Sequence, residues 1–277
     1  MDETNREIVV GYDGSPEADV ALTWAARAAS LENRAVKVLM VGDLSTSPSS
    51  APEEGPDHDH LVRAEATLER VGTGGLVERR TGAIVPVLLD AGRDASMIVV
   101  GSHGRGRVAE AFLGSVSQHV ARHAPCPVVV VREPAQPTSS RIVVGIDGSG
   151  ASAAALEFAC RRAELTKEDV VAVHAWKIGS VLIDRQGRLP DSIGRTIEDH
   201  ELVLSESVAG VRADHPDVTL LEEAIPVAPG QALVDASSTA SLVVTGSRGR
   251  GAFAGMLLGS VSHELLCRAH CPVAIIR

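Results

Sequence analysis

The sequence has few cysteines, no long hydrophobic run and no signal-like start. Its 277 residues include four cysteines, all in apolar surroundings, as expected of reduced thiols in a cytosol. No apolar run approaches the ~18 residues of a membrane helix. The beginning, MDETNRE, is acidic and polar, unlike a signal peptide. We therefore expect a soluble, cytoplasmic protein.

The chain also lacks a basic block. Lys and Arg number 26 against 36 for Asp and Glu, which gives a formal net charge of −10. Because nucleic-acid binding depends mainly on neutralising phosphates, this balance argues against a nucleic-acid partner. Hydrophobic residues make up 44% of the chain, which is ample for packed cores. The length fits one large domain or two ordinary ones.

The chain is an internal duplication. IVVGYDGS at Ile8–Ser15 recurs as IVVGIDGS at Ile142–Ser149, and Cys126-Pro-Val recurs as Cys271-Pro-Val. The segment Glu133–Ser140, which reads EPAQPTSS, has the proline and small polar residues of a linker. We predict two domains, at residues 1–135 and 140–277.

Two segments carry the same glycine pattern. Residues 101–117 read GSHGRGRVAEAFLGSVS and residues 246–262 read GSRGRGAFAGMLLGSVS, with 11 identical positions. Glycine permits positive φ and lets backbone N–H groups approach a ligand, and a Gly-Ser pair that opens a helix adds free N–H donors. One copy alone would suggest a flexible loop, but two copies favour a polyphosphate-binding loop. Its predicted residues are Gly101, Ser102, Gly104, Gly114, Ser115, Val116 and Ser117, and Gly246, Ser247, Gly249, Gly259, Ser260, Val261 and Ser262.

Short apolar strands alternate with helical patterns in each half, which predicts an α/β fold with a doubly wound, Rossmann-like parallel sheet. In the first half, Ser15-Pro-Glu marks a helix start and Val116–His123 a short helix. Ser45–His60 is interpreted as a surface loop. The strands of the first half are expected at Ile8–Tyr12, Val36–Val41, Leu76–Arg80, Met97–Gly101 and Val128–Val131.

Asp13 and Asp147 each end a first strand and precede Gly14-Ser15 and Gly148-Ser149. Such an aspartate either forms a turn that caps the next helix or contacts a ligand at the carboxyl edge of the sheet. We favour ligand contact, and the two roles can coexist.

Other candidates for chemistry are weaker. Arg105 and Arg250 are candidates to offset phosphate charge, although a solvated loop arginine is almost as good an interpretation. Asp57–His60 has metal-binding residue types, but it lies in the expected loop and has no counterpart in the second half. We predict no metal site made by the protein alone and no catalytic residue.

The motifs V-V-G-x-D-G-S, G-S-x-G-R-G, G-S-V-S and C-P-V together resemble the universal stress protein family, in its ATP-binding branch, over essentially the whole chain. The resemblance implies two tandem five-stranded sheets of order 3-2-1-4-5, each holding ATP or ADP, with Mg²⁺, at its carboxyl edge. It places Asp13 and Asp147 near the ribose and phosphates, and the glycine and serine residues around the triphosphate. Val41 and its counterpart near Trp176 would offer backbone groups to adenine.

We expect a nucleotide-binding switch or sensor with an unknown protein partner. A slow ATPase and an interaction module with structural ATP are the alternatives, because the motifs supply no P-loop lysine, base or arginine finger. The apolar fifth strands, Pro127–Val131 and Pro272–Ile276, would be sheet edges that need cover. The resemblance implies that they pair within the chain as a pseudo-dimer, and a homodimer is a further option.

Overall fold

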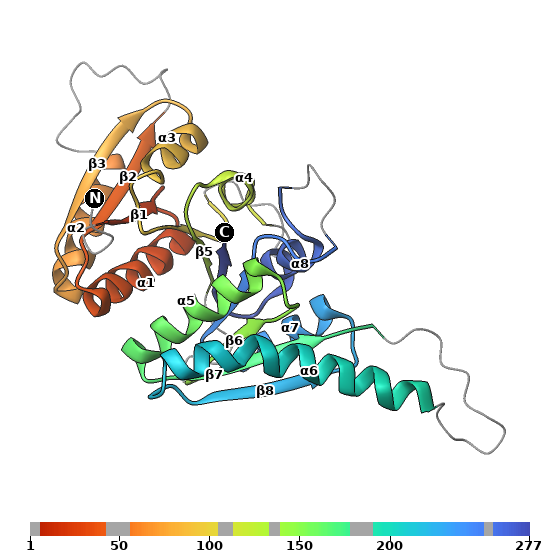
Figure 1. The fold of residues 1–277 in the computed structure, drawn as a ribbon. Coiled ribbons are helices and arrows are strands. Elements are labelled where there is room, and N and C mark those ends of the chain that lie inside the picture. The colour runs from red at the N-terminus through yellow and green to blue at the C-terminus, as the bar shows by residue number, and fades with distance from the viewer. Residues whose placement is uncertain (1–5, 43–55, 105–112, 133–138, 178–190, 252–256) are drawn as a thin grey trace. The chain divides into compact units, whose positions relative to one another are not determined.

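The structure is a computed structural model that describes residues 6–42, 56–104, 113–132, 139–177, 191–251 and 257–277. The chain divides into two compact units, Met1–Glu133 and Pro134–Arg277. Each unit has an open sheet flanked by helices (Figure 1). Within the described ranges, no helix has the length and apolar character needed to cross a membrane.

The first unit has a parallel sheet of order β3-β2-β1-β4-β5, which confirms the predicted order and fold class. Its elements are β1 (Ile8–Gly11), α1 (Pro16–Glu32), β2 (Val36–Gly42), α2 (Pro56–Val71), β3 (Gly75–Thr81), α3 (Ile84–Ala91), β4 (Met97–Gly101), α4 (Ser115–His123) and β5 (Val128–Val131).

The second unit repeats this topology as β8-β7-β6-β9-β10, again all parallel. Its elements are β6 (Arg141–Gly145), α5 (Gly150–Thr166), β7 (Asp169–Ala175), α6 (Asp191–Asp214), β8 (Leu220–Ile225), α7 (Pro229–Ser237), β9 (Leu242–Gly246), α8 (Ser260–Arg268) and β10 (Val273–Ile276).

Both sheets are covered on both faces. Every residue of β4, β5, β9 and β10 is buried. Helices α1 and α2 pack together, as do α3 and α4. A Cβ on Gly11 would meet Leu88 of α3, and a Cβ on Gly101 would meet Glu17 of α1, so the two helix pairs cover opposite faces. This double cover explains why the strands are almost continuously apolar.

The strand order reverses next to β1 and next to β6. Ile8 of β1 pairs with Val36 of β2 on one side and with Met97 of β4 on the other. Strand β6 lies between β7 and β9 in the same way. Doubly wound sheets bind ligands outside the carboxyl ends of their strands at such a reversal. The functional site is therefore sought where β1 and β4, and β6 and β9, end.

The prediction of a loop over Ser45–His60 is wrong for its last five residues. Helix α2 begins at Pro56, so Asp57–His60 lie in its first turns, and residues 43–55 lie outside the described residues. Proline fits the first position of a helix, and Ala64 and Leu68, four residues apart, are buried. The helical spacing of those apolar residues explains why the helix forms here.

Helix α6 is fixed to α5 through a histidine that directly follows it. His215 Nδ1 lies 2.7 Å from Glu164 Oε1, and its Nε2 lies 3.1 Å from Glu157 Oε2. Burial alone would lower the pKa of His215. Its hydrogen bonds to the two carboxylates outweigh burial and raise the pKa above the ordinary value of 6.5.

We expect His215→Gln to lower the free energy of unfolding by about 1 kcal/mol at pH 6 and by less at pH 9. Because the folded-state pKa is raised, the stabilisation is complete below the unfolded pKa and is lost as the pH rises through the folded pKa. Urea denaturation of both proteins at both pH values measures the difference, with exposed His270→Gln as the control. An equal loss at both pH values would contradict the assignment.

Candidate functional site

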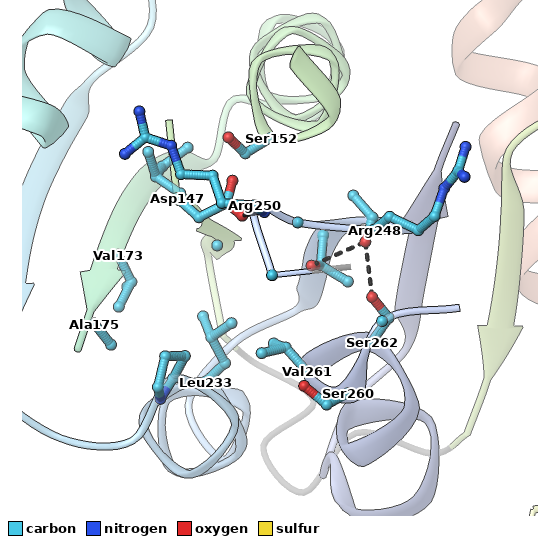
Figure 2. A pocket seen from close by; sticks show the side chains of 18 residues that line it. Asp147, Ser152, Val173, Ala175, Leu233, Arg248, Arg250, Ser260, Val261 and Ser262 are labelled. Atoms are coloured by element: carbon cyan, nitrogen blue, oxygen red, sulfur yellow. Dashed lines mark hydrogen bonds between the residues drawn. The ribbon is translucent and has the colours of Figure 1, made fainter. Parts of the chain in front are cut away.

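In the second unit, a cavity of about 470 Å³ opens at the carboxyl ends of β6 and β9 (Figure 2). The cavity is bounded by the loop after β9 and by the first turns of α7 and α8. Its lining contains the sequence-predicted residues Asp147, Gly246, Gly249, Arg250, Gly259, Ser260, Val261 and Ser262.

The first unit has the corresponding cavity, with a volume of about 310 Å³. The predicted residues that line it are Asp13, Val41, Gly101, Gly104, Gly114, Ser115, Val116 and Ser117. Arg105 lies outside the described residues. The other predicted residues are absent from the two linings as described: Gly14, Ser15, Ser102, Gly148, Ser149 and Ser247.

The base of each glycine loop is closed by the same two hydrogen bonds. In the second unit the Gly259 N–H donates to the Ser247 carbonyl at 2.8 Å, and Ser262 Oγ donates to the Gly246 carbonyl at 2.7 Å. Figure 2 shows Ser262 reaching back to the end of β9. In the first unit the Gly114 bond is 2.8 Å and the Ser117 bond 2.6 Å. The start of α8 or α4 is therefore tied to the end of a buried strand.

The helices that start at these loops have no side-chain cap. Gly259 and Gly114 occupy the N-cap positions of α8 and α4, and neither helix has a side-chain hydrogen bond at its cap. Helices α5 and α1 differ, because Ser149 and Ser15 accept a hydrogen bond from the first turn at 3.2 Å. The first N–H groups of a helix need a partner from outside it. Among the described residues, no side chain accepts from the first amides of α8 and α4, and Ser260 and Ser115 at these helix starts line the cavities.

Asp147 joins the turn after β6 to the glycine loop. Its Oδ1 accepts the Ser149 N–H at 3.0 Å, and its Oδ2 accepts the Arg250 N–H at 2.9 Å. Burial raises the pKa of Asp147, but hydrogen bonds from Ser149 and Arg250 outweigh burial and leave it below its ordinary value. Asp13 accepts from Ser15 in the same way, from N–H at 3.0 Å and from Oγ at 2.6 Å. The turn-forming role is therefore present in both units.

Positive φ occurs in these turns and is absent from the described loop glycines. Gly14 and Gly148 have φ of +76° and +74°, a region that other residues rarely adopt. A Cβ on Gly14 would also lie 2.3 Å from His60 Nδ1 of α2. Gly101 and Gly104 have no positive φ, so this freedom of glycine is not what these two positions use.

The loop glycines are required by close contacts instead. A Cβ on Gly246 would lie 2.9 Å from the carbonyl carbon of Ala151, and one on Gly101 would lie 2.9 Å from that of Glu17. A Cβ on Gly249 would lie 2.2 Å from Asp147 Oδ2. These distances are shorter than real contacts, so the helix after the first strand and the aspartate exclude any side chain here.

The arginine side chains of the second loop do not point at the start of α8. In Figure 2, the side chains of Arg248 and Arg250 both extend away from Ser260. The guanidinium of Arg250 packs near Gly148, where a Cβ would lie 3.4 Å from its Cζ. In this structure Arg250 therefore contributes its main-chain N–H to the site through Asp147, and its side chain extends away from the start of α8.

The other end of each cavity is apolar, and the sequence reasoning missed most of it. Val173 and Ala175 lie at this end in the second unit, and Leu233 lies between Ala175 and Val261 (Figure 2). Ala175 is the counterpart of Val41, because β2 pairs with β1 in the same register as β7 pairs with β6. Val41 is the last residue but one of β2, and Ala175 is the last residue of β7. Leu233 and its counterpart Leu88 come from α7 and α3. The signal that could have found them is an apolar helix in the same place in both halves.

In the second unit, two hydrogen-bonded histidines connect α6 to the strand end that precedes Asp147. His174 Nδ1 donates to the carbonyl of Ile146, the residue before Asp147, at 2.7 Å. Its Nε2 then accepts from His200 Nδ1 of α6 at 2.8 Å, and the His200 ring stacks on Trp176. Met40 occupies the position of His174 in the first unit. This link from α6 to the site therefore belongs to the second unit.

The chain matches the model of the universal stress protein family over residues 4–132 and again over 138–277. A universal stress protein of Mycobacterium bovis is 36% identical to it over 304 aligned residues, which cover 99% of this chain and 96% of that protein. A universal stress protein of Mycobacterium tuberculosis is 35% identical over 289 residues, with 98% and 96% covered.

Solved structures show the same fold. A universal stress protein from Archaeoglobus fulgidus matches with a TM-score of 0.69 at 21% identity, covering 100% of this chain and 99% of that one. A protein from Pseudomonas aeruginosa matches with a TM-score of 0.70 at 17% identity, covering 99% and 93%.

We expect Gly249→Ala to break the bond between Asp147 and the Arg250 N–H and to destabilise the second unit by about 1–3 kcal/mol. Gly251→Ala is the matched control, because a Cβ there meets nothing within 4 Å. Hydrogen exchange of the Arg250 amide and urea denaturation measure the two effects. Unchanged protection of that amide in Gly249→Ala would show that the loop does not depend on this contact.

Proposed function

The chain belongs to the universal stress protein family, and on that premise we propose that each unit binds one ATP or ADP molecule, with Mg²⁺. The nucleotide is placed with its phosphates at the start of α4 or α8 and its base at the apolar end of the cavity. The protein then acts as a nucleotide-dependent switch or sensor in a stress response. Pairing of the two fifth strands and homodimer formation stay predictions.

The observation that carries this proposal is the contrast between capped and uncapped helices. In each unit the first helix and the last helix both begin beside the cavity, and a serine side chain caps only the first of them. Helices α3 and α7 also begin there without a side-chain cap, but the loop that leads into α4 or α8 is the one that carries the repeated glycines. The uncapped start has free N–H groups and the positive end of the helix dipole, which together favour phosphate. The same contrast occurs in both halves of the duplication.

The rest of the cavity suits a nucleoside. Val173 and Ala175 offer an apolar surface on the side away from Ser260 (Figure 2). Volumes of about 470 and 310 Å³ fall within the usual range of small-molecule sites or close to its lower end. Asp13 and Asp147 bring negative charge close to the phosphates, which is one reason to expect Mg²⁺. Because both Asp147 oxygens already accept N–H bonds, phosphate and water would be the main Mg²⁺ ligands.

We expect the purified chain to release ATP or ADP on heat denaturation and, once emptied, to bind two nucleotides per chain. Gly114→Val and Gly259→Val should each remove about one of the two sites. The backbone allows valine at both positions, where φ is −61° and −71°. A Cβ on Gly114 would lie 3.2 Å from the Ser102 carbonyl oxygen, and one on Gly259 would lie 3.5 Å from that of Ser247, so the branched side chain should push the loop and the helix start apart. Calorimetry with ATP and Mg²⁺ measures the stoichiometry.

The controls are Gly74→Val and Gly210→Val, which lie in open space in the first and second unit. Both should retain two sites. A wild-type chain that neither carries nor binds nucleotide would refute the proposal. Loss of both sites in either single variant would instead show that the two units do not bind independently.

Hydrolysis is expected to be slow, well below the ~10 s⁻¹ median of enzymes. No lysine is among the described residues that line either cavity. His103, a possible base, lines the first cavity, but Arg248 takes its place in the second. Phosphate release at saturating ATP and Mg²⁺ measures the turnover. Fast release that disappears in an Asp13→Asn, Asp147→Asn double variant would make the protein an ATPase.

A further inference from the structure

The outward face of α4 carries two exposed histidines. His119 and His123 are four residues apart, so their side chains lie on the same face of the helix, one turn from each other. Their ring centroids are 6.3 Å apart and the ring planes differ by 14°. Neither ring takes part in the cavity of the first unit.

Main-chain hydrogen bonds determine which nitrogen of each ring is free. His119 Nδ1 lies 2.7 Å from the carbonyl oxygen of Ser115, and His123 Nδ1 lies 2.9 Å from that of His119. A carbonyl oxygen only accepts, so Nδ1 carries the proton in both rings. In the neutral ring, Nε2 then has a free lone pair. An imidazole with this tautomer, held through its other N–H, is the usual form of a metal-binding histidine.

We propose that His119 and His123 bind one divalent transition-metal ion, of the Zn²⁺ or Ni²⁺ type, through their two Nε2 atoms. Metal–nitrogen bonds of ~2.0–2.1 Å require the two rings to move closer together, and both exposed side chains have the freedom to do so. The described residues contain no group of three or more His, Cys, Asp or Glu side chains suited to a metal. We assign the remaining coordination positions of the ion to water.

The second unit uses the same two positions differently. Glu264 and Arg268 of α8 correspond to His119 and His123, and they form an ion pair with each other. Arg268 also donates to Gln231 Oε1 of α7 at 3.1 Å. The proposed metal site therefore belongs to the first unit.

A second pair of metal-binding side chains, on α8, must be eliminated so that metal binding by the α4 pair can be measured alone. His263 Nε2 lies 4.0 Å from Cys267 Sγ, four residues along the same helix. A thiolate with an imidazole is itself a good ligand pair for zinc. Metal binding is therefore measured in a Cys267→Ser background, in which the α4 pair keeps both of its ligands and the α8 pair does not.

The site on α4 is one hydrogen bond away from the proposed phosphate site. The carbonyl that holds His119 belongs to Ser115, the first residue of α4 and part of the cavity lining. A bound metal ion makes the Nδ1–H of His119 a stronger donor and so stiffens this first turn. This link to phosphate rests on the proposed function, whereas metal binding by the two histidines does not.

The test uses the full, untagged chain without nucleotide, titrated with Ni²⁺ in a calorimeter at pH 7.5. We expect one ion per chain at this site. The decisive variant is Gln118→His with His119→Gln, which keeps the number of histidines but places them five residues apart, on different faces of α4. It should bind Ni²⁺ about tenfold more weakly or worse, because the second ligand no longer adds to the first.

His123→Gln should show the same loss, and His270→Ala, which removes an exposed histidine elsewhere, should show none. Equal Ni²⁺ affinity in the parent and the shifted variant, or no binding in the parent, would overturn the proposal. Because no nucleotide is present, that result would leave the proposed nucleotide sites untouched.

Discussion

The hydrogen bond from the Gly114 N–H to the Ser102 carbonyl, with its counterpart from Gly259 to Ser247, is the constraint on which both sites depend. It brings the two ends of the glycine loop together and sets the residue at which the next helix begins. Ser117 or Ser262 adds a second tie to the strand end. Because that strand is buried in the sheet, the helix start is held as firmly as the core. Its N–H groups are therefore fixed in direction before any ligand arrives, which lowers the entropy cost of binding.

The two ends of each cavity have opposite characters, and this explains why they suit a molecule with an apolar base and a charged tail. The polar end consists of main-chain N–H groups and serine hydroxyls, and the arginine side chains described in the second unit extend away from it (Figure 2). Fixed dipoles of this kind stabilise a negative ligand without placing a mobile acid or base against it. The arrangement favours holding a phosphate over cleaving it.

The strand order followed from the family resemblance that the repeated motifs carry, and the structure confirms it. Many of the glycines and serines of those motifs line the two cavities, because each motif stands at the end of a strand. The sequence was a poorer guide to why glycine is required at each position. Positive φ is needed at Gly14 and Gly148, in turns that look like ordinary helix starts, whereas the loop glycines are set by neighbouring backbone. Such contacts join residues far apart in the chain, and no local pattern reports them. The apolar end was missed for the same reason, because Leu233 reaches the cavity only through the packing of α7 on the sheet.

Helices α4 and α8 also show how the two halves have been free to differ. Ser117 and Ser262 face inward, occupy equivalent positions and donate equivalent hydrogen bonds to a glycine carbonyl. Two positions further along, His119 and Glu264 are also equivalent in position, but their side chains differ in chemistry. Natural selection can act separately on each outer surface as long as the inner surface is kept. Tandem duplication therefore gives an organism two diverging versions of one module that are always inherited together and always made in equal amounts.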